Sequence, residues 1–183
     1  MNKIKTLKEL GGIVAKARKK GKTIVLANGI FDLIHVGHVR YLRAAKSLGD
    51  LLIVAVNSDG SARVLKGPGR PIAPLKERME ILSNIRWIDY CVSFPGKSVG
   101  KVILTLKPDI HAKGTDYTRD TVPEREAVRS YGGRIAIVGD LKRHSTSALI
   151  QRIKETHSIT IPLPLRERPR GPLPRSMQGE VRG

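Results

Sequence analysis

The chain has 183 residues, 40% of them hydrophobic, which suits one domain of ordinary size with a full core. Its single cysteine, Cys91, excludes an intrachain disulfide, and no stretch approaches the roughly 18 apolar residues of a membrane-spanning helix. We therefore expect a cytoplasmic protein without a membrane segment. The net charge of +18 is typical of nucleic-acid binding, but aromatic residues make up only 4% of the chain, too few for a base-stacking surface.

The excess positive charge gathers at the two ends of the sequence. Residues 1–22 hold eight basic side chains against one glutamate, and residues 162–183 hold five arginines against two glutamates. From residue 161 onward, prolines and arginines replace any hydrophobic periodicity. We predict that residues 161–183 form a disordered, basic, proline-rich tail, and we expect no specific nucleic-acid partner.

The region between the two ends alternates between helical and strand-like patterns. Leu7, Leu10 and Val14 space an amphipathic helix within residues 1–22, and the strand-like run 23–27 follows it. Further along, the pattern predicts a helix from about residue 37, a strand at 51–56, a Gly/Pro-rich connector at 59–74, helices at 74–85, 99–106, 124–131 and 147–156, and strands at 88–94, 109–112 and 134–138.

This alternation predicts the fold class. Strands that alternate with helices imply an α/β domain with a Rossmann-like open parallel sheet and helices on both faces. We place this single domain at residues 23–160, after the N-terminal amphipathic helix of residues 1–22. Ligands of such sheets bind outside the carboxyl ends of the strands.

The most informative motif follows the first predicted strand. The run from Asn28 to His38 reads Asn-Gly-Ile-Phe-Asp-Leu-Ile-His-Val-Gly-His. It places His35 in a strand-to-helix loop and His38 in the first helical turn, where free backbone amides and the helix dipole attract anions. Gly37 has no side chain, so a phosphate can approach the backbone closely. Two surface histidines in a loop are the simpler alternative.

The motif resembles the signature of the cytidylyltransferase-like nucleotidyltransferases. The resemblance implies that His35 and His38 are catalytic and bind the α- and β-phosphates of a nucleoside triphosphate. Lys66, on the connector, is the third catalytic candidate, because a lysine can neutralise polyphosphate. The nucleotide-binding set that we predict is Gly29, Ile30, Phe31, His35, Gly37, His38, Lys66, Asp116, Ser145 and Thr146.

Each of the later candidates also has an ordinary structural interpretation. Asp116 follows the strand 109–112 and can cap a turn as readily as it can accept hydrogen bonds from a ribose or a base. Ser145 and Thr146 precede the last helix and are ordinary N-cap residues. Weaker candidates for substrate contacts are Asp32, Arg70, Arg78 and Arg86, and the arginines at 78 and 86 suit structural ion pairs better. The chain's five histidines lack the carboxylate and cysteine neighbours of a metal cage, so we predict no metal held by the protein.

Within the family, the chain is similar to the adenylyltransferases that convert D-glycero-β-D-manno-heptose 1-phosphate and ATP into ADP-heptose and pyrophosphate. The similarity rests on the histidine motif, Asn57 to Asp59, Leu65 to Pro71, Lys113 to Tyr117, Tyr131 to Arg134 and Ser145 to Ser147. It implies Mg²⁺ with ATP, a role in lipopolysaccharide core or other surface-glycan synthesis, a separate heptose kinase upstream and a homodimer. Physical reasoning leaves three alternatives open: cytidylyl transfer to glycerol 3-phosphate, adenylyl transfer to a flavin phosphate, and a basic nucleic-acid binder on an inactive fold.

Overall fold

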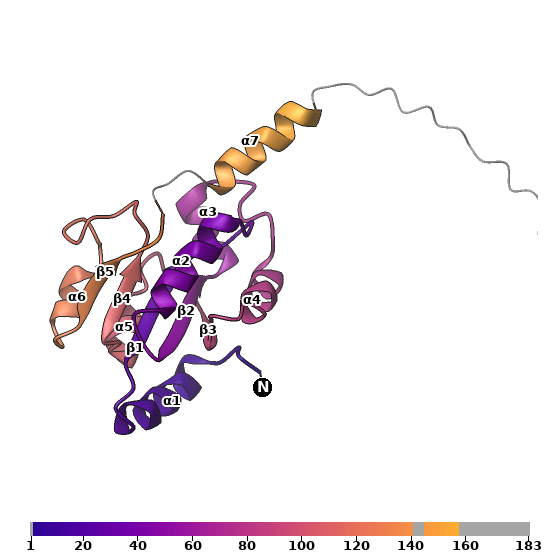
Figure 1. Ribbon diagram of the computed structural model, residues 1–183. Coiled ribbons are helices and arrows are strands. Elements are labelled where there is room, and N and C mark those ends of the chain that lie inside the picture. Colours follow the sequence, from indigo (N-terminus) through magenta and orange to yellow (C-terminus); the bar gives the residue numbers. More distant parts are fainter. Residues whose placement is uncertain (1, 141–144, 158–183) are drawn as a thin grey trace, which may run out of the picture.

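The computed structural model describes residues 2–140 and 145–157, so the predicted tail at 161–183 lies outside this part of the chain. Within it, five parallel strands form one sheet in the order β3-β2-β1-β4-β5, with helices on both faces (Figure 1). The predicted Rossmann-like open sheet is confirmed. The strands are β1 (Ile24–Gly29), β2 (Leu51–Asn57), β3 (Tyr90–Phe94), β4 (Ile110–Lys113) and β5 (Arg134–Ile137), and the helices are α1 (Leu7–Lys19), α2 (Val36–Lys46), α3 (Asp59–Lys66), α4 (Leu75–Ser83), α5 (Gly100–Leu106), α6 (Arg125–Arg129) and α7 (Thr146–His157).

The strand order creates a switch point beside the central strand. From β1 the chain moves outward to β2 and β3, then returns across the sheet to β4, which pairs with the other side of β1. The loops that leave β1 and β4 therefore diverge to opposite faces, and a crevice opens between them at the carboxyl ends of the strands. The histidine motif leaves β1 at this point.

Two apolar clusters, one for each face of the sheet, hold the fold together. Along β1, Ile24 and Leu26 pack with α1 and α5 on one face, whereas Val25 and Ala27 pack with α2 and α4 on the other. All four side chains are fully buried. The first helix belongs to this core, because α1 buries Leu10 in the same cluster as Ile24 and Leu26.

The expectation of an irregular connector over 59–74 is wrong for its first half. Residues 59–66 form α3, which begins where the Ser58 hydroxyl accepts a hydrogen bond from the amide of Ser61 at 3.2 Å. The helix ends at Gly67, whose φ of +90° favours glycine. Gly60 lowers the intrinsic helix propensity of the segment, and this masked the N-cap signal. Lys66 is therefore the last residue of a helix.

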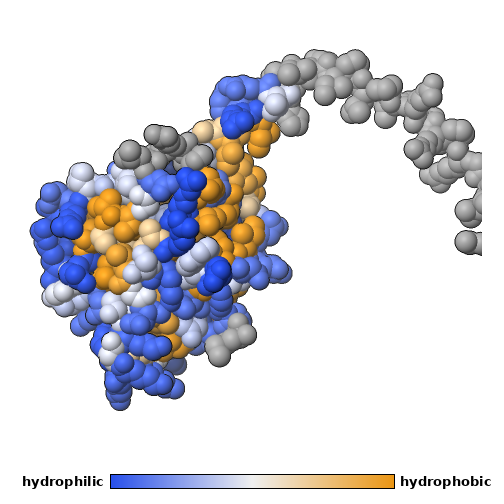
Figure 2. Space-filling view, viewed as in Figure 1, coloured by the Kyte–Doolittle hydropathy of each residue, from blue (hydrophilic) through white to orange (hydrophobic). Residues whose placement is uncertain are grey.

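Helix α7 joins the body of the protein at its first turn. The Thr146 hydroxyl donates to the carbonyl of Leu33 at 3.4 Å, which places the start of α7 against the loop between β1 and α2. Figure 2 shows apolar residues on the surface below α7. Val64 of α3 and Ile72 of the following connector are more than half exposed. Among the described residues, no helix is long and apolar enough to cross a membrane.

Candidate active site

The loop that leaves β1 has a constrained backbone. Phe31 adopts a φ of +50°, a left-handed conformation that is costly for a residue with a side chain and clusters at ligand sites. Its buried ring lies against Gly29, where an added Cβ would approach the ring to 3.0 Å. Glycine at position 29 therefore lets the phenyl ring fold back beneath the loop, and the loop then delivers His35 to the N-cap of α2.

The two histidine rings stack at the start of α2, a contact that the sequence analysis did not predict. The ring centroids of His35 and His38 lie 3.8 Å apart with an interplanar angle of 22°, and the Phe31 ring meets the His38 ring edge-on at 5.3 Å. Burial lowers the pKa of His38 to about 4, and the neighbouring His35 adds to the shift. The pair thus presents imidazole nitrogens at the positive end of a helix dipole.

Arg78 ties together the loops on the α2 side of the crevice. Its side chain is fully buried, and Nη2 donates to the carbonyl of Asn57 at 2.9 Å and to the carboxylate of Asp59 at 2.8 Å. Nε donates to the carbonyl of Ala73 at 3.0 Å, and Nη1 donates to the carbonyl of Ile30. This guanidinium joins the ends of β1 and β2 to the segment before α4, and all its nitrogens are engaged by the protein itself.

Asp32 and Arg70, two other predicted substrate contacts, pair with each other. Nε of Arg70 lies 2.7 Å from a carboxylate oxygen of Asp32, whose side chain is only 1% exposed. The other oxygen accepts hydrogen bonds from the amides of Ile72 and Ala73 at 2.8 and 2.9 Å. Asp32 therefore holds residues 70–73 against the histidine loop. Arg86 does not join this group; it precedes β3, at the amino end of the sheet, and its guanidinium lies over the ring of Trp87.

The remaining nucleotide-binding candidates reach the carboxyl ends of the strands from other elements. Ser145 caps α7, since its hydroxyl accepts from the amide of Ala148 at 3.1 Å, and Thr146 contacts the histidine loop as described above. Lys66 is exposed at the end of α3, which follows β2. Asp116 is exposed in the turn after β4. The predicted set thus comes from the segments that follow β1, β2 and β4 and from the start of α7.

A buried polar network at the end of β4 is the main feature that sequence reasoning missed. Lys113 donates to Oδ1 of Asn28 at 3.1 Å, pairs with Glu124 at 3.4 Å, and lies over the ring of Tyr117 at 4.7 Å. Nε2 of His111 contacts the same Asn28 oxygen at 3.1 Å. Burial lowers the pKa of His111 to about 4 and also lowers the pKa of Lys113. Polar residues within an otherwise apolar strand were the signal that could have revealed it.

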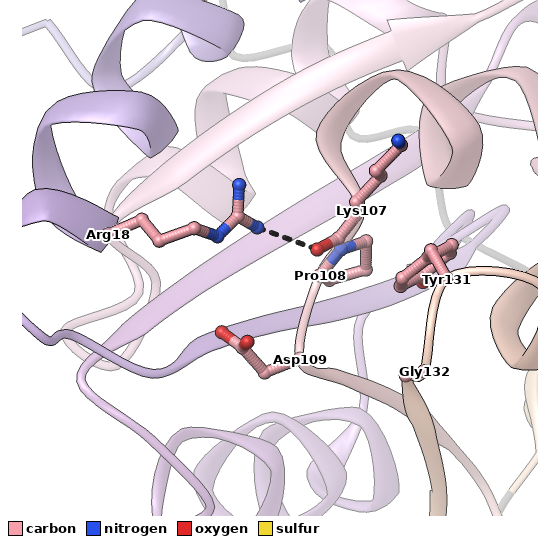
Figure 3. Close-up of a pocket in the computed structure, with 7 residues that line it drawn as sticks. Arg18, Lys107, Pro108, Asp109, Tyr131 and Gly132 are labelled. Carbon is pink, nitrogen blue, oxygen red and sulfur yellow. Dashed lines mark hydrogen bonds between the residues drawn. The ribbon is translucent and has the colours of Figure 1, made fainter.

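A polar cavity of about 290 Å³ lies at the opposite, amino end of the sheet (Figure 3). Arg18 of α1 reaches across it and donates to the carbonyl of Lys107 at 2.7 Å. Asp109 lines the cavity and accepts from the amide of Ile24 at 2.7 Å, which fixes the start of β4 beside β1. The Tyr131 hydroxyl is buried and has no hydrogen-bond partner among the described residues. This cavity is remote from the histidines, and its polar groups mainly brace the turns before β4 and β5.

No group of three or more histidine, cysteine, aspartate or glutamate side chains within residues 2–140 and 145–157 is arranged to hold a metal ion.

Comparisons with known proteins identify relatives of this chain. The chain is 46% identical over 155 residues to the bifunctional protein HldE of Geobacter sulfurreducens and 45% identical over 156 residues to that of Syntrophotalea carbinolica. Each alignment covers 85% of this chain but 32% of the relative, so the chain spans about a third of the length of these relatives.

Two solved structures share the fold. The lipopolysaccharide core biosynthesis protein from Thermoplasma volcanium matches with a TM-score of 0.59 and 29% identity, over 67% of this chain and 100% of that protein. The pantoate-beta-alanine ligase from Francisella tularensis matches with a TM-score of 0.53 over 82% of this chain and 76% of that protein, at 16% identity. The cytidylyltransferase-like family model matches residues 26–161. This match contains the histidine loop, the switch point and the start of α7, and the chain belongs to the cytidylyltransferase-like family.

Proposed function

We propose that this protein is an adenylyltransferase that converts D-glycero-β-D-manno-heptose 1-phosphate and ATP into ADP-heptose and pyrophosphate. The observation that carries the proposal is the stacked His35 and His38 pair at the start of α2, in a chain 45–46% identical to bifunctional proteins named HldE. The motifs at Lys66 to Arg70 and Lys113 to Tyr117 favour the heptose substrate over the alternatives. The likeness to a lipopolysaccharide core biosynthesis protein supports a role in surface-glycan synthesis.

The reaction needs no general base. An oxygen of the sugar 1-phosphate, already ionised at neutral pH, attacks the α-phosphorus of ATP in line with the bond to the β-phosphate. A new phosphorus–oxygen bond forms, the α–β bridging bond breaks, and its electrons leave on pyrophosphate. Catalysis then consists of positioning the reactants and stabilising the charge that builds up on the phosphate oxygens.

The histidine pair suits this task. At neutral pH, His38 meets the nucleotide as a neutral imidazole, because burial holds its pKa at about 4. Its neutral N–H group can donate a hydrogen bond to a phosphate oxygen without a buried positive charge in the empty site. Once bound, the anionic triphosphate favours the protonated form of His38. His35, stacked on it, lies at the N-cap of α2, where the backbone amides of the first turn add further donors.

Cationic and hydroxyl groups from neighbouring elements complete the proposed phosphate site. Lys66, exposed at the end of α3, would neutralise the β- and γ-phosphates, and Ser145 and Thr146 would bind them at the start of α7. The structure supports these roles for Ser145 and Thr146 through the contact between α7 and the histidine loop. Mg²⁺ would arrive as part of the ATP complex and neutralise the leaving pyrophosphate.

The substrate implies an upstream reaction. A sugar 1-phosphate of this kind is the product of phosphoryl transfer to the anomeric hydroxyl, so we propose a heptose kinase as the supplier. We also propose a homodimer, which sedimentation equilibrium would test.

A pyrophosphate-release screen tests the function directly. Four nucleoside triphosphates are paired with heptose 1-phosphate, glycerol 3-phosphate, a flavin phosphate and other phosphorylated acceptors. We expect ATP with the β-anomer of heptose 1-phosphate to be the fastest pair and the α-anomer to be poor. A preference for CTP with glycerol 3-phosphate, or for ATP with the flavin phosphate, would replace the proposal with that alternative. Tight, salt-resistant binding to nucleic acid without turnover would favour the non-enzymatic alternative.

A further inference from the structure

Asn28 stands at the centre of the carboxyl edge of the sheet. It is the residue before the last of β1, the middle strand, and it precedes Gly29 and the histidine loop. Through its side chain it contacts the end of β4, the strand on the other side of the switch point. Asn28 therefore lies where the two diverging loops separate, which is where open parallel sheets bind ligands.

The orientation of the Asn28 amide follows from its partners. Lys113 has only donor hydrogens, so the atom it contacts at 3.1 Å must be the amide oxygen. His111 contacts the same oxygen at 3.1 Å and, since burial keeps its ring neutral at physiological pH, it donates from Nε2. Two donors fill the two lone pairs of Oδ1. The amide cannot flip without placing N–H groups against an ammonium group.

Further groups hold Lys113 in place. Glu124 pairs with the ammonium at 3.4 Å and accepts a hydrogen bond from Ser98 through its other oxygen at 3.2 Å. The ring of Tyr117 covers the ammonium at 4.7 Å. Both members of the Lys113–Glu124 pair are nearly buried, at 7% and 6% exposure of their side chains. Burying such a pair contributes little to stability compared with apolar residues of the same size, so we assign it a role in positioning.

The other end of the Asn28 amide remains available. Nδ2 carries two N–H groups and has no hydrogen-bond partner within residues 2–140 and 145–157, and it is not among the buried unpaired atoms of this region. Within this part of the chain, its two N–H groups are therefore not used by the protein itself. An ammonium bound at the oxygen polarises the amide and makes its N–H groups stronger donors.

We propose that Asn28 is a substrate-binding residue that donates a hydrogen bond from Nδ2 to a phosphate oxygen at the reaction centre, with Lys113 and His111 as positioning residues. This assignment rests on the proposed function for the presence of phosphates at this edge. The phosphate belongs either to ATP or to the sugar 1-phosphate, and the two arms of the experiment below separate these sources.

The test is Asn28→Asp, which keeps the shape of the side chain and the oxygen facing Lys113 but replaces the donor with an anionic oxygen. The matched control is Asn84→Asp, at the exposed C-cap of α4. One arm measures the affinity for ATP by calorimetry, and the other measures the KM for heptose 1-phosphate together with kcat. Thermal melting accompanies both arms.

We expect Asn28→Asp to melt within a few degrees of wild type and to lose about 10- to 100-fold in one of the two arms, the scale of a hydrogen bond to a charged group. The control variant should match wild type in both. A loss confined to the calorimetric arm assigns the contact to ATP, and a loss confined to KM and kcat assigns it to the acceptor.

Two outcomes would overturn the proposal: Asn28→Asp within twofold of wild type in both arms, or an equal loss in the control. If Asn28→Asp fails to fold, Asn28→Ser, which retains a polar atom but cannot reach as far, takes its place under the same criteria. A wild-type protein that binds ATP but does not use heptose 1-phosphate would contradict the proposed function instead. In that case the calorimetric arm alone decides the role of Asn28.

Discussion

The two sides of the crevice each bury a cation, but they anchor it differently. On the α2 side, Arg78 donates mainly to backbone carbonyls, among them those of Asn57 and Ala73, so it fixes the course of the chain itself. On the β4 side, the Lys113 ammonium contacts only side chains among the described residues, and its network ends in the amide of Asn28. A cation that binds the backbone stabilises the fold, whereas a cation that orients another side chain can position that side chain for a ligand. The predictions below test this division.

The largest effect on stability should follow the loss of the Arg78 guanidinium, the cation that binds the backbone. Arg78→Met leaves three backbone carbonyls without their buried donor and removes the partner of the partly exposed Asp59 carboxylate, so we expect the free energy of unfolding to fall by about 3–5 kcal/mol. Urea denaturation measures it. Arg86→Met, which loses only an exposed stacking contact on Trp87, should cost less than about 1 kcal/mol. Equal losses in the two variants would remove the distinction between Arg78 and an ordinary surface arginine.

In contrast to Arg78, substitution of either histidine should lower turnover strongly and leave the fold intact. Replacing either His35 or His38 by alanine removes one preorganised donor, and we expect kcat to fall by about 100-fold or more. Pyrophosphate release measures turnover, and circular dichroism checks that the fold persists. Near-normal turnover in either variant would exclude that histidine from the mechanism, and loss of the folded protein would instead assign it a structural role.

Acidification should weaken the folded state through one histidine on each side of the crevice. Burial lowers the pKa of both His38 and His111 from 6.5 to about 4, so the unfolded chain binds protons that the folded protein does not. This stability is complete above about pH 6.5 and is lost as the pH falls toward 4. Each group contributes a slope of up to about 1.4 kcal/mol per pH unit.

Urea denaturation between pH 7 and 4 measures this slope. His38→Gln and His111→Gln should each make it shallower, by similar amounts, because neither glutamine titrates in this range. A wild-type stability that is flat across this window would contradict the pKa assignments for both histidines.

The smallest effect belongs to the amino end of the sheet. Tyr131→Phe removes a buried hydroxyl that has no partner among the described residues, so we expect the free energy of unfolding to change by no more than about 0.5 kcal/mol and turnover to remain at the wild-type level. Melting curves and the pyrophosphate assay measure these quantities. A marked loss of turnover would mean that the cavity beside Arg18 is coupled to the carboxyl edge.

The sequence predicted those parts of the molecule that rest on local patterns. The positions of His35 and His38 follow from a strand, a glycine and a helix that are adjacent along the chain, and the parallel sheet follows from the alternation of elements. The helix at 59–66 was missed, because Gly60 and the later prolines outweighed the capping signal of Ser58. Local propensity is a weak guide where a single cap decides the outcome.

The polar networks could not be predicted for a different reason. The contact between Asn28 and Lys113 joins residues 85 positions apart, and it depends on β4 pairing with β1 rather than with β3. Similarly, Asp32 and Arg70 were candidates for substrate contacts, because the sequence does not reveal that they pair with each other and that Asp32 accepts from amides of the connector. Strand order had to be known before either network could be recognised.

The N-terminal segment before α1 has a consequence for handling the protein. Cys91, on the edge strand β3, donates its amide to the carbonyl of Lys3 at 2.9 Å and accepts from the amide of Lys5 at 2.9 Å. This short strap covers an edge that would otherwise be open to pairing with another chain. Burial of the Cys91 side chain in the apolar cluster beside α4 raises the pKa of its thiol to about 12, and the thiolate is the form that oxidises. Because Cys91 is the only cysteine of the sequence, storage in air without a reducing agent should produce no disulfide-linked dimers while the strap stays in place.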